Sequence, residues 1–276
     1  MGRGFDEFES SGWERIAAAY DGFFDSIGAR LAEPLLDAAG VEVGSRLLDV
    51  GCGPGYVGLA AAARGADVTA SDVAASMVEL ARSRGLNAVQ GDAEHLRFAD
   101  RDFDVVVANL LLPHLSRPEE VAVEMTRVLA PGGRLVLSTW AGPSESRLMG
   151  VFVDAARKAG AVPPPDLPAG PDVFRFADYA QIASLLGRAG LSDIDTRTIR
   201  WQQKHLGADS LWNSIMAGTV RTAALVTAQP RDVQKRIRRE YDLLMHDHPT
   251  SVPVAVVVAS GRLQIYPAAP PAPTTC

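Results

Sequence analysis

The 276-residue sequence has few cysteines, no excess of basic residues and no long apolar run. Cys52 and Cys276 cannot form a disulfide framework, which is typical of a reducing compartment. A formal net charge of −6 argues against a nucleic-acid-binding surface, which needs a basic face. No segment approaches the roughly 18 apolar residues of a membrane span. We therefore expect a cytoplasmic monomer or homodimer that binds neither nucleic acid nor membrane.

What the sequence does have is an alternation of apolar strands with amphipathic helices. The strands are expected at about 46–50, 66–71, 87–90, 104–108, 133–139, 193–203 and 253–260, and the helices between them near 56–64, 75–84, 118–128, 144–159 and 178–188. Such alternation indicates a parallel sheet with helices on both faces. The length favours one domain with an insertion over two independent domains.

The segment from Leu47 to Gly55, Leu-Leu-Asp-Val-Gly-Cys-Gly-Pro-Gly, is the most informative part of the chain. Its first four residues read as the end of a buried strand, and its three glycines form a tight turn into the next helix. This arrangement builds the cofactor crevice of an open α/β sheet. A dinucleotide fingerprint would need glycine where Tyr56 stands. Asp49 beside the loop suits a cationic amino group better than a phosphate.

This motif resembles the first motif of class I S-adenosylmethionine-dependent methyltransferases, of the type that acts on small molecules. Four later segments match the family in order and spacing: 68–72, 90–94, 103–109 and 129–137. Pro54 and Pro113 depart from its commoner residues. The resemblance implies an α/β fold with a seven-stranded, Rossmann-like, mostly parallel sheet. The last strand would be antiparallel and lie between the fifth and the sixth.

The resemblance also implies S-adenosyl-L-methionine as cofactor and S-adenosyl-L-homocysteine as product. Asp72 would accept hydrogen bonds from the ribose hydroxyls, Asp92 would take the adenine amino group, and the Ala93 amide would contact the ring. The expected cofactor-binding set is Asp49, Gly51, Cys52, Gly53, Gly55, Asp72, Val73, Met77, Asp92, Ala93 and Asn109. From the residues alone, Asp72 could equally cap a helix, Asp92 could be a turn residue, and Cys52 is more readily a loop filler than a nucleophile.

Segments outside the core are assigned by their composition. Residues 1–43 are predicted to form an N-terminal helical lid with a frayed start, followed by helices at 13–24 and 27–39. The Rossmann-like core covers 44–205 and 251–265, and the proline-rich residues 266–276 are predicted to be a disordered tail.

Residues 206–250 are an insertion where a minimal sheet of this family would have a hairpin. Two apolar helical stripes predict two helices: Trp212, Met216, Val220 and Ala223 mark the first, and Val233, Ile237, Tyr241 and Leu244 mark the second. The basic residues beside the second stripe fit a solvated face. We expect this insertion to be a helical cap over an acceptor pocket.

His114 and Tyr20 are the candidates for catalysis. His114 follows the fourth strand, where acceptors of this family dock, and imidazole titrates near neutral pH. It could instead only structure its loop, as the matching histidine of the family often does. The predicted substrate-binding residues are Trp13, Tyr20, His114, Trp140, Trp212 and Met216. No group of residues has the spacing of a metal site.

The sequence thus favours methyl transfer to a small, largely apolar metabolite, such as a specialised natural product, with O-, N- and C-methylation all open. The alternatives are an NAD(P)-dependent oxidoreductase, which the missing third glycine and Asp49 oppose, and a catalytically silent protein that binds the cofactor.

Overall fold

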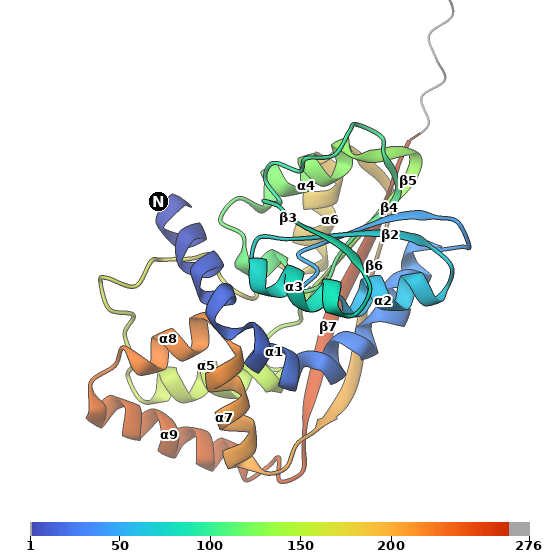
Figure 1. Cartoon of the computed structure of the whole chain (residues 1–276). Coiled ribbons are helices and arrows are strands. Elements are labelled where there is room, and N and C mark those ends of the chain that lie inside the picture. Colours follow the sequence, from blue (N-terminus) through green and yellow to red (C-terminus); the bar gives the residue numbers. More distant parts are fainter. Residues whose placement is uncertain (1, 265–276) are drawn as a thin grey trace, which may run out of the picture.

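Strands and helices alternate along residues 2–264, which a computed structural model describes (Figure 1). The strands are β1 (Arg46–Val50), β2 (Asp67–Asp72), β3 (Asn87–Gln90), β4 (Phe103–Ala108), β5 (Leu129–Trp140), β6 (Leu191–Lys204) and β7 (Ser251–Leu263). The helices are α1 (Gly2–Ala39), α2 (Tyr56–Ala63), α3 (Ala75–Ser83), α4 (Pro118–Arg127), α5 (Arg147–Lys158), α6 (Tyr179–Arg188), α7 (Ala208–Gly218), α8 (Arg221–Thr227) and α9 (Arg231–Met245), with short turns η1 (Leu112–His114) and η2 (Arg175–Ala177).

The described strands form one seven-stranded sheet in the order β3-β2-β1-β4-β5-β7-β6. Strands β1 to β5 pair in parallel, whereas β7 runs antiparallel to both β5 and β6. The predicted fold is confirmed, including the position of the antiparallel last strand. None of the helices in residues 2–264 has the length and apolar character needed to cross a membrane. The predicted disordered tail, 266–276, lies outside the described residues.

The core has two layers because successive side chains of a strand point to opposite faces of the sheet. Leu47 packs with the cluster that includes buried residues of α1, α2, α3 and α5. Its neighbour Leu48 packs in the other cluster, with buried residues of α4 and α6. Both residues are fully buried. The near-continuous apolar runs of the central strands follow from this burial on both faces.

The N-terminal lid is one helix of 38 residues, α1, and not a frayed start followed by two helices. The sequence predicted a frayed start at residues 1–10 and a break between residues 24 and 27. Packing overrides both signals. A Cβ on Gly12 would lie 2.4 Å from Cγ1 of Val220, so the missing side chain lets α1 approach the cap closely. Phe5 is buried as well, which anchors the first turns.

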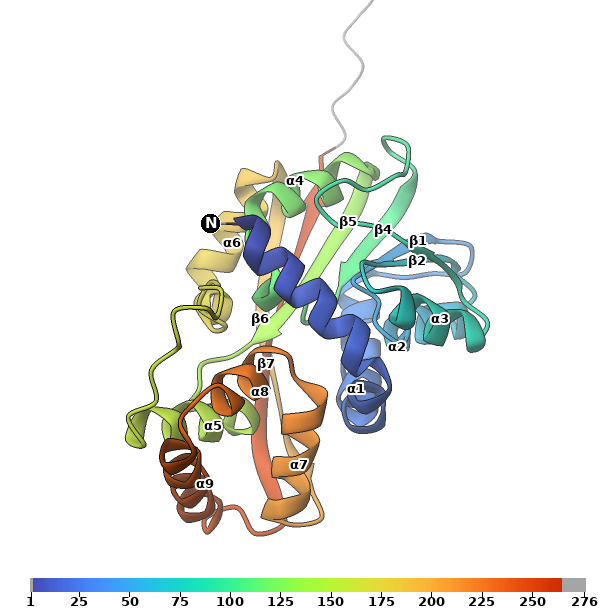
Figure 2. The ribbon, with the colours of Figure 1, turned by 60° about the vertical axis from the view of Figure 1, so that its left-hand side comes forward.

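The insertion has three helices, α7, α8 and α9, where two were predicted. The expected first stripe is interrupted because Thr219 has extended backbone (φ −129°, ψ 143°) between α7 and α8. Figure 2 shows α5, α7, α8 and α9 gathered at one end of the sheet, with α1 running beside them. Contacts of α9 with α5 and of α7 with α1 join the insertion to both elements. The N-terminal half of α1 and the insertion therefore form one wall.

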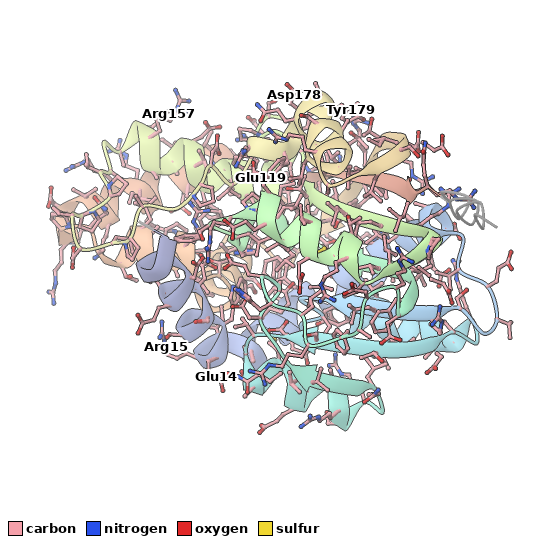
Figure 3. The ribbon with its side chains drawn as sticks, turned by 90° about the horizontal axis from the view of Figure 1, so that it is seen from above. Glu14, Arg15, Glu119, Arg157, Asp178 and Tyr179 are labelled. Atoms are coloured by element: carbon pink, nitrogen blue, oxygen red, sulfur yellow. The ribbon has the colours of Figure 1, made fainter. Side chains whose placement is uncertain are left out.

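Polar side chains fix the ends and outer faces of these helices. Asp178 caps α6 by accepting a hydrogen bond from the Ala180 amide at 2.8 Å. Glu14, on the outward side of α1 in Figure 3, accepts from the Ser76 amide at 3.1 Å and so ties α1 to α3. The Glu14 contact helps to position α1 across the strand ends that form the site.

Candidate active site

A cavity of about 410 Å³ lies between the glycine turn, the carboxyl ends of β1, β2 and β4, helix α1 and the α7–α8 turn. Most of the residues predicted for the site line it: Trp13, Tyr20, Gly51, Gly53, Asp72, Val73, Met77, Asp92, Ala93, Asn109, His114 and Trp140. Five predicted residues do not line it: Asp49, Cys52, Gly55, Trp212 and Met216. The site therefore gathers segments that are far apart in the sequence.

The glycine turn after β1 has the backbone that its sequence predicts. Gly51, Gly53 and Gly55 have φ angles of +65°, +52° and +91°, a region that side chains rarely adopt. A Cβ on Gly51 would also lie 2.8 Å from Cδ1 of Leu111. The turn thus presents bare backbone to the cavity, which a cofactor can approach closely.

Asp72 joins this turn to the end of β2. Its Oδ2 accepts from the Gly53 amide at 2.8 Å and its Oδ1 from the Ala74 amide at 2.9 Å. Only 9% of the residue is exposed. Burial raises the pKa of the Asp72 carboxyl, while the amide hydrogen bonds act in the opposite direction. Each carboxylate oxygen keeps an acceptor position, so Asp72 can hold the turn and also accept ribose hydroxyls.

Asp49 occupies a different environment from the predicted one. It is 1% exposed, and its Oδ2 accepts from the Gly58 amide of α2 at 3.0 Å. Burial raises the pKa of Asp49 to about 7. The carboxyl group therefore fastens α2 to β1 beneath the turn, and the expectation that it faces a ligand's amino group does not fit this position. Cys52 is also buried, and burial raises the pKa of its thiol, as expected for a loop filler.

The turn after β4 is strained at the cavity. Leu110 has a φ of +56°, which is uncommon for a residue with a side chain. Ser138 of β5 stabilises this turn, because its hydroxyl accepts from the Leu110 amide at 2.9 Å and donates to Oδ1 of Asn109 at 2.7 Å. The turn directs the following segment, which contains His114, toward α1.

Aromatic rings of α1 cover the cavity. The Tyr20 ring stacks on Phe24 at 4.7 Å and meets the edge of Trp13 at 5.3 Å. Burial raises the pKa of Tyr20 well above its usual range, and the charges of Asp72 and Asp21 add to this effect. The hydroxyl therefore stays protonated, so Tyr20 can donate a hydrogen bond but cannot act as a base near neutral pH.

His114 is paired with a residue that sequence reasoning missed. Its Nδ1 lies 2.9 Å from Oε2 of Glu9, and the same oxygen accepts from Nε1 of Trp13 at 2.9 Å. Glu9 is only 3% exposed. The signal was present in the sequence, because Phe5, Glu9 and Trp13 recur every four residues, as on one face of a helix. The polar composition of residues 1–10 hid it.

Arg221, at the start of α8, is the second residue missed. Its guanidinium donates to the carbonyl oxygens of Pro113 at 3.1 Å and Pro171 at 2.7 Å and lies over the Phe5 ring. It forms no ion pair with any residue in 2–264, although it lines the cavity. Nothing in its local sequence separates it from the other basic residues of the insertion.

Trp212 and Met216 were predicted to line the pocket, but the structure places them elsewhere. The Trp212 ring packs against Phe152 at 5.4 Å and Tyr241 at 5.0 Å, with the Arg238 guanidinium over its face. Met216 packs with the same core cluster. These residues hold α7 to α5 and α9. The cap meets the cavity instead through the α7–α8 turn, residues 218–222.

Asp92, Glu94 and His95 bring potential metal ligands within 4.8 Å of one another. Glu94 is already paired with Arg117, and the side chains of Asp92 and His95 are 60% and 79% exposed. Oδ1 of Asp92 accepts from the Glu94 amide at 2.9 Å, which makes it a turn residue. Because Asp92 also lines the cavity, it remains available to a ligand's amino group.

Known proteins are similar to this chain in sequence and in fold. Residues 48–137 match the model of a methyltransferase domain. The malonyl-[acyl-carrier protein] O-methyltransferase of Herminiimonas arsenicoxydans is 33% identical over 213 residues, which cover 75% of each chain. The chain belongs to the class I S-adenosylmethionine-dependent methyltransferases. This membership makes it an enzyme and decides against the oxidoreductase and silent-binder alternatives.

Two further proteins are similar to this methyltransferase, one in sequence and one in fold. The demethylmenaquinone methyltransferase of Paenarthrobacter aurescens is 28% identical over 201 residues, 68% of this chain and 79% of its own. The fold of the YcgJ protein from Bacillus subtilis matches with a TM-score of 0.57 and 20% identity, over 86% of this chain and 99% of that one. The cofactor of this methyltransferase is S-adenosylmethionine.

Proposed function

We propose that this methyltransferase transfers a methyl group to a small, largely apolar acceptor bound between α1, β5 and the cap. The proposal rests on one observation: polar and glycine residues line one side of the cavity, and apolar residues line the other. Gly51, Asp72 and Asp92 lie at the strand ends, whereas Trp140, Met149, Phe24, Val173 and Val220 supply apolar surface from α1, β5, α5 and the cap side. An acceptor with a substantial apolar part would bury it against the second group.

The residues at the strand ends fit the cofactor. Bound S-adenosylmethionine supplies an electrophilic methyl group on a sulfonium. Asp72 would accept its ribose hydroxyls, because the carboxylate is nine-tenths buried, fixed by two amides and open to the cavity. Asp92 and Ala93 line the next part of the cavity and would contact the adenine. The bare backbone of the glycine turn leaves room for the remaining part of the cofactor.

Methyl transfer requires in-line positioning more than covalent chemistry from the protein. Tyr20 and Trp13 would cover the reacting groups and exclude water. Two relatives, by name, act on malonyl-[acyl-carrier protein] and on demethylmenaquinone, which supports an acceptor with a long apolar or acyl part. That the acceptor is a specialised natural product stays a prediction.

The test is methyl transfer from methyl-labelled S-adenosylmethionine to three acceptors: a demethylmenaquinol, a malonyl thioester and a short hydrophilic alcohol of similar donor chemistry. We expect label in an apolar acceptor and none in the hydrophilic one. The Val220→Asp variant should lose transfer while S-adenosylhomocysteine still binds in calorimetry. Equal transfer to the hydrophilic alcohol, or normal transfer by Val220→Asp, would contradict an apolar acceptor site.

A further inference from the structure

The side of the cavity between α1 and η1 contains a buried carboxylate in which only one of the two oxygens has hydrogen-bond partners. Oε2 of Glu9 contacts Trp13 and His114, but its Oε1 is buried without a hydrogen-bond partner among residues 2–264. A buried acceptor left unpaired costs about 1–3 kcal/mol, so such an arrangement is rare without a purpose. Because Glu9 lines the cavity, a ligand that donates a hydrogen bond would complete it.

The same contact decides the protonation of the imidazole. A carboxylate only accepts hydrogen bonds, so the 2.9 Å contact requires a proton on Nδ1 of His114. In the neutral ring the lone pair is then on Nε2. Nε2 has no hydrogen-bond partner among the described residues, and 26% of the side chain is exposed, on the wall of the cavity. The edge of the ring also packs against Trp13 at 4.8 Å, which fixes its orientation.

We propose that Nε2 of His114 accepts the proton of a hydroxyl group on the methyl acceptor, and that Glu9 is the positioning residue that holds the imidazole in the required tautomer. This inference rests on the proposed function and deepens it, because it makes the enzyme an O-methyltransferase. The hydroxyl proton moves to Nε2, and an oxygen lone pair forms the new bond to the methyl carbon. The carbon–sulfur bond breaks with its electrons left on sulfur, and the imidazolium later releases its proton to water.

Charge on the same wall favours a hydroxyl over an ammonium group. Arg221 has no carboxylate partner among residues 2–264 and holds a fixed positive charge beside η1 through the Pro113 carbonyl. That charge stabilises an oxygen that becomes negative, although Glu9 on the same wall has the opposite charge. A hydroxyl gains nucleophilicity when a base removes its proton, and the resulting negative oxygen is stabilised beside Arg221, whereas an ammonium group that loses its proton becomes neutral and gains nothing from that charge. A base held in one tautomer is therefore useful chiefly for oxygen.

Several charged groups face His114 and enter any pH dependence. Glu9 contacts it from α1, and Asp6 of the same helix hydrogen-bonds Ser116 two residues further along. Asp72 at the end of β2 interacts with it through space. Arg221 of α8 bonds the carbonyl of the preceding residue. Glu9 is the member of this group that touches the imidazole directly.

The test is ¹⁵N NMR of histidine-labelled protein loaded with S-adenosylhomocysteine at pH 8. The chain has five histidines, and His114→Gln assigns the signal of interest. The probes are 1-naphthol and 1-(aminomethyl)naphthalene, which place a hydroxyl and an ammonium group on the same apolar frame. We expect the Nδ1–H tautomer at His114 and a change in its Nε2 resonance with naphthol but not with the amine.

The matched variants are Glu9→Gln and Ser116→Ala. Glutamine keeps a partner for Trp13 but removes the charge and can donate to Nδ1, so both tautomers should appear. Naphthol affinity should fall at least about twofold, because only the ring with its lone pair on Nε2 can accept the hydroxyl proton. Ser116→Ala removes the neighbouring contact between α1 and this loop, made to Asp6 at 2.8 Å, and should leave the His114 signal unchanged. Melting curves confirm that each variant folds.

The possible failures can be told apart. A dominant Nε2–H tautomer in the wild type, no response of Nε2 to naphthol, an equal response to the amine, or an unchanged tautomer in Glu9→Gln would each overturn the proposal. An equal tautomer change in Ser116→Ala would mean that the Glu9 contact only holds α1 against η1 and does not by itself set the tautomer of His114. Absence of S-adenosylhomocysteine binding would instead contradict the proposed function.

Discussion

The two walls of the cavity are built in different ways. The cofactor wall consists of turns that directly follow β1, β2, β3 and β4, and its central contact joins Asp72 to Gly53, 19 residues away. The wall opposite brings together α1, η1 and the insertion, and its central contact joins Glu9 to His114 across 105 residues. The first wall is set by short motifs, whereas the second depends on how distant helices pack. Acceptor specificity can therefore change with helix packing while the cofactor turns stay the same.

The largest expected effect comes from a variant that disturbs only the wall formed by α1, η1 and the insertion. Trp212→Ala should lower the free energy of unfolding by about 3 kcal/mol, the low end for a buried aromatic because the ring is partly exposed. S-adenosylhomocysteine affinity of the folded protein should not change. Urea unfolding and calorimetry measure the two quantities. Leu243→Ala, at a 55% exposed position of α9, is the control and should change stability by less than about 0.5 kcal/mol. Normal stability together with impaired acceptor binding would show that Trp212 lines the acceptor pocket after all.

A second variant breaks the cofactor wall. Asp72→Ala removes the acceptor for the Gly53 amide and the proposed acceptor for ribose. Loss of a charge-assisted hydrogen bond costs about 1.5–3 kcal/mol, so the dissociation constant of S-adenosylhomocysteine should rise roughly ten- to a hundredfold in calorimetry. Asp67→Ala, at the exposed start of the same strand, serves as the control. An unchanged affinity would leave Asp72 as a structural tie within the turn.

A third variant sharpens the division within the cofactor wall, where Asp49 supports the turn from below. Burial raises the pKa of Asp49 to about 7 in the folded protein, against about 3.9 in an unfolded chain. The folded state therefore binds this proton more tightly, and the wild type loses stability as pH rises from about 4 to 7. An asparagine at this position would keep an acceptor for the Gly58 amide without that penalty. Relative to the wild type, Asp49→Asn should gain at least about 1 kcal/mol between pH 5 and pH 8.

Urea unfolding at the two pH values measures this difference. Asp104→Asn is the control: Arg46 lowers the pKa of Asp104, so its charged form stabilises the fold at both pH values and the variant should lose the same stability at pH 5 and at pH 8. Its effect should remain below about 1 kcal/mol, since the ion pair is exposed at the surface. An equal stability change in Asp49→Asn at both pH values would contradict the raised pKa of Asp49. A selective loss of S-adenosylhomocysteine binding would instead give the carboxylate a direct role at the ligand.

The contrast between the walls also explains what the sequence could predict. Leu47, Val106 and their neighbours form apolar runs bounded by turn residues, so the strands were predictable from the residues, and the family resemblance supplied their order. Residues 1–10 and the junction between 24 and 27 lack a clear helical pattern, yet α1 continues through both because its buried face packs along its whole length. The position of Trp212 behind the cavity depends on α5 and α9. No local sequence pattern indicates a contact between elements that lie so far apart in the chain.

The most direct test of the account is a crystal structure with S-adenosylhomocysteine. The account predicts ribose hydroxyls within about 2.6–3.2 Å of the Asp72 carboxylate and the adenine beside Asp92 and Ala93. It also predicts that the sulfur faces a free space bordered by Glu9 and His114. A ligand that fills the apolar space beside Trp140 instead, or that makes no contact with Asp72, would contradict the division of the cavity into a cofactor wall and an acceptor wall.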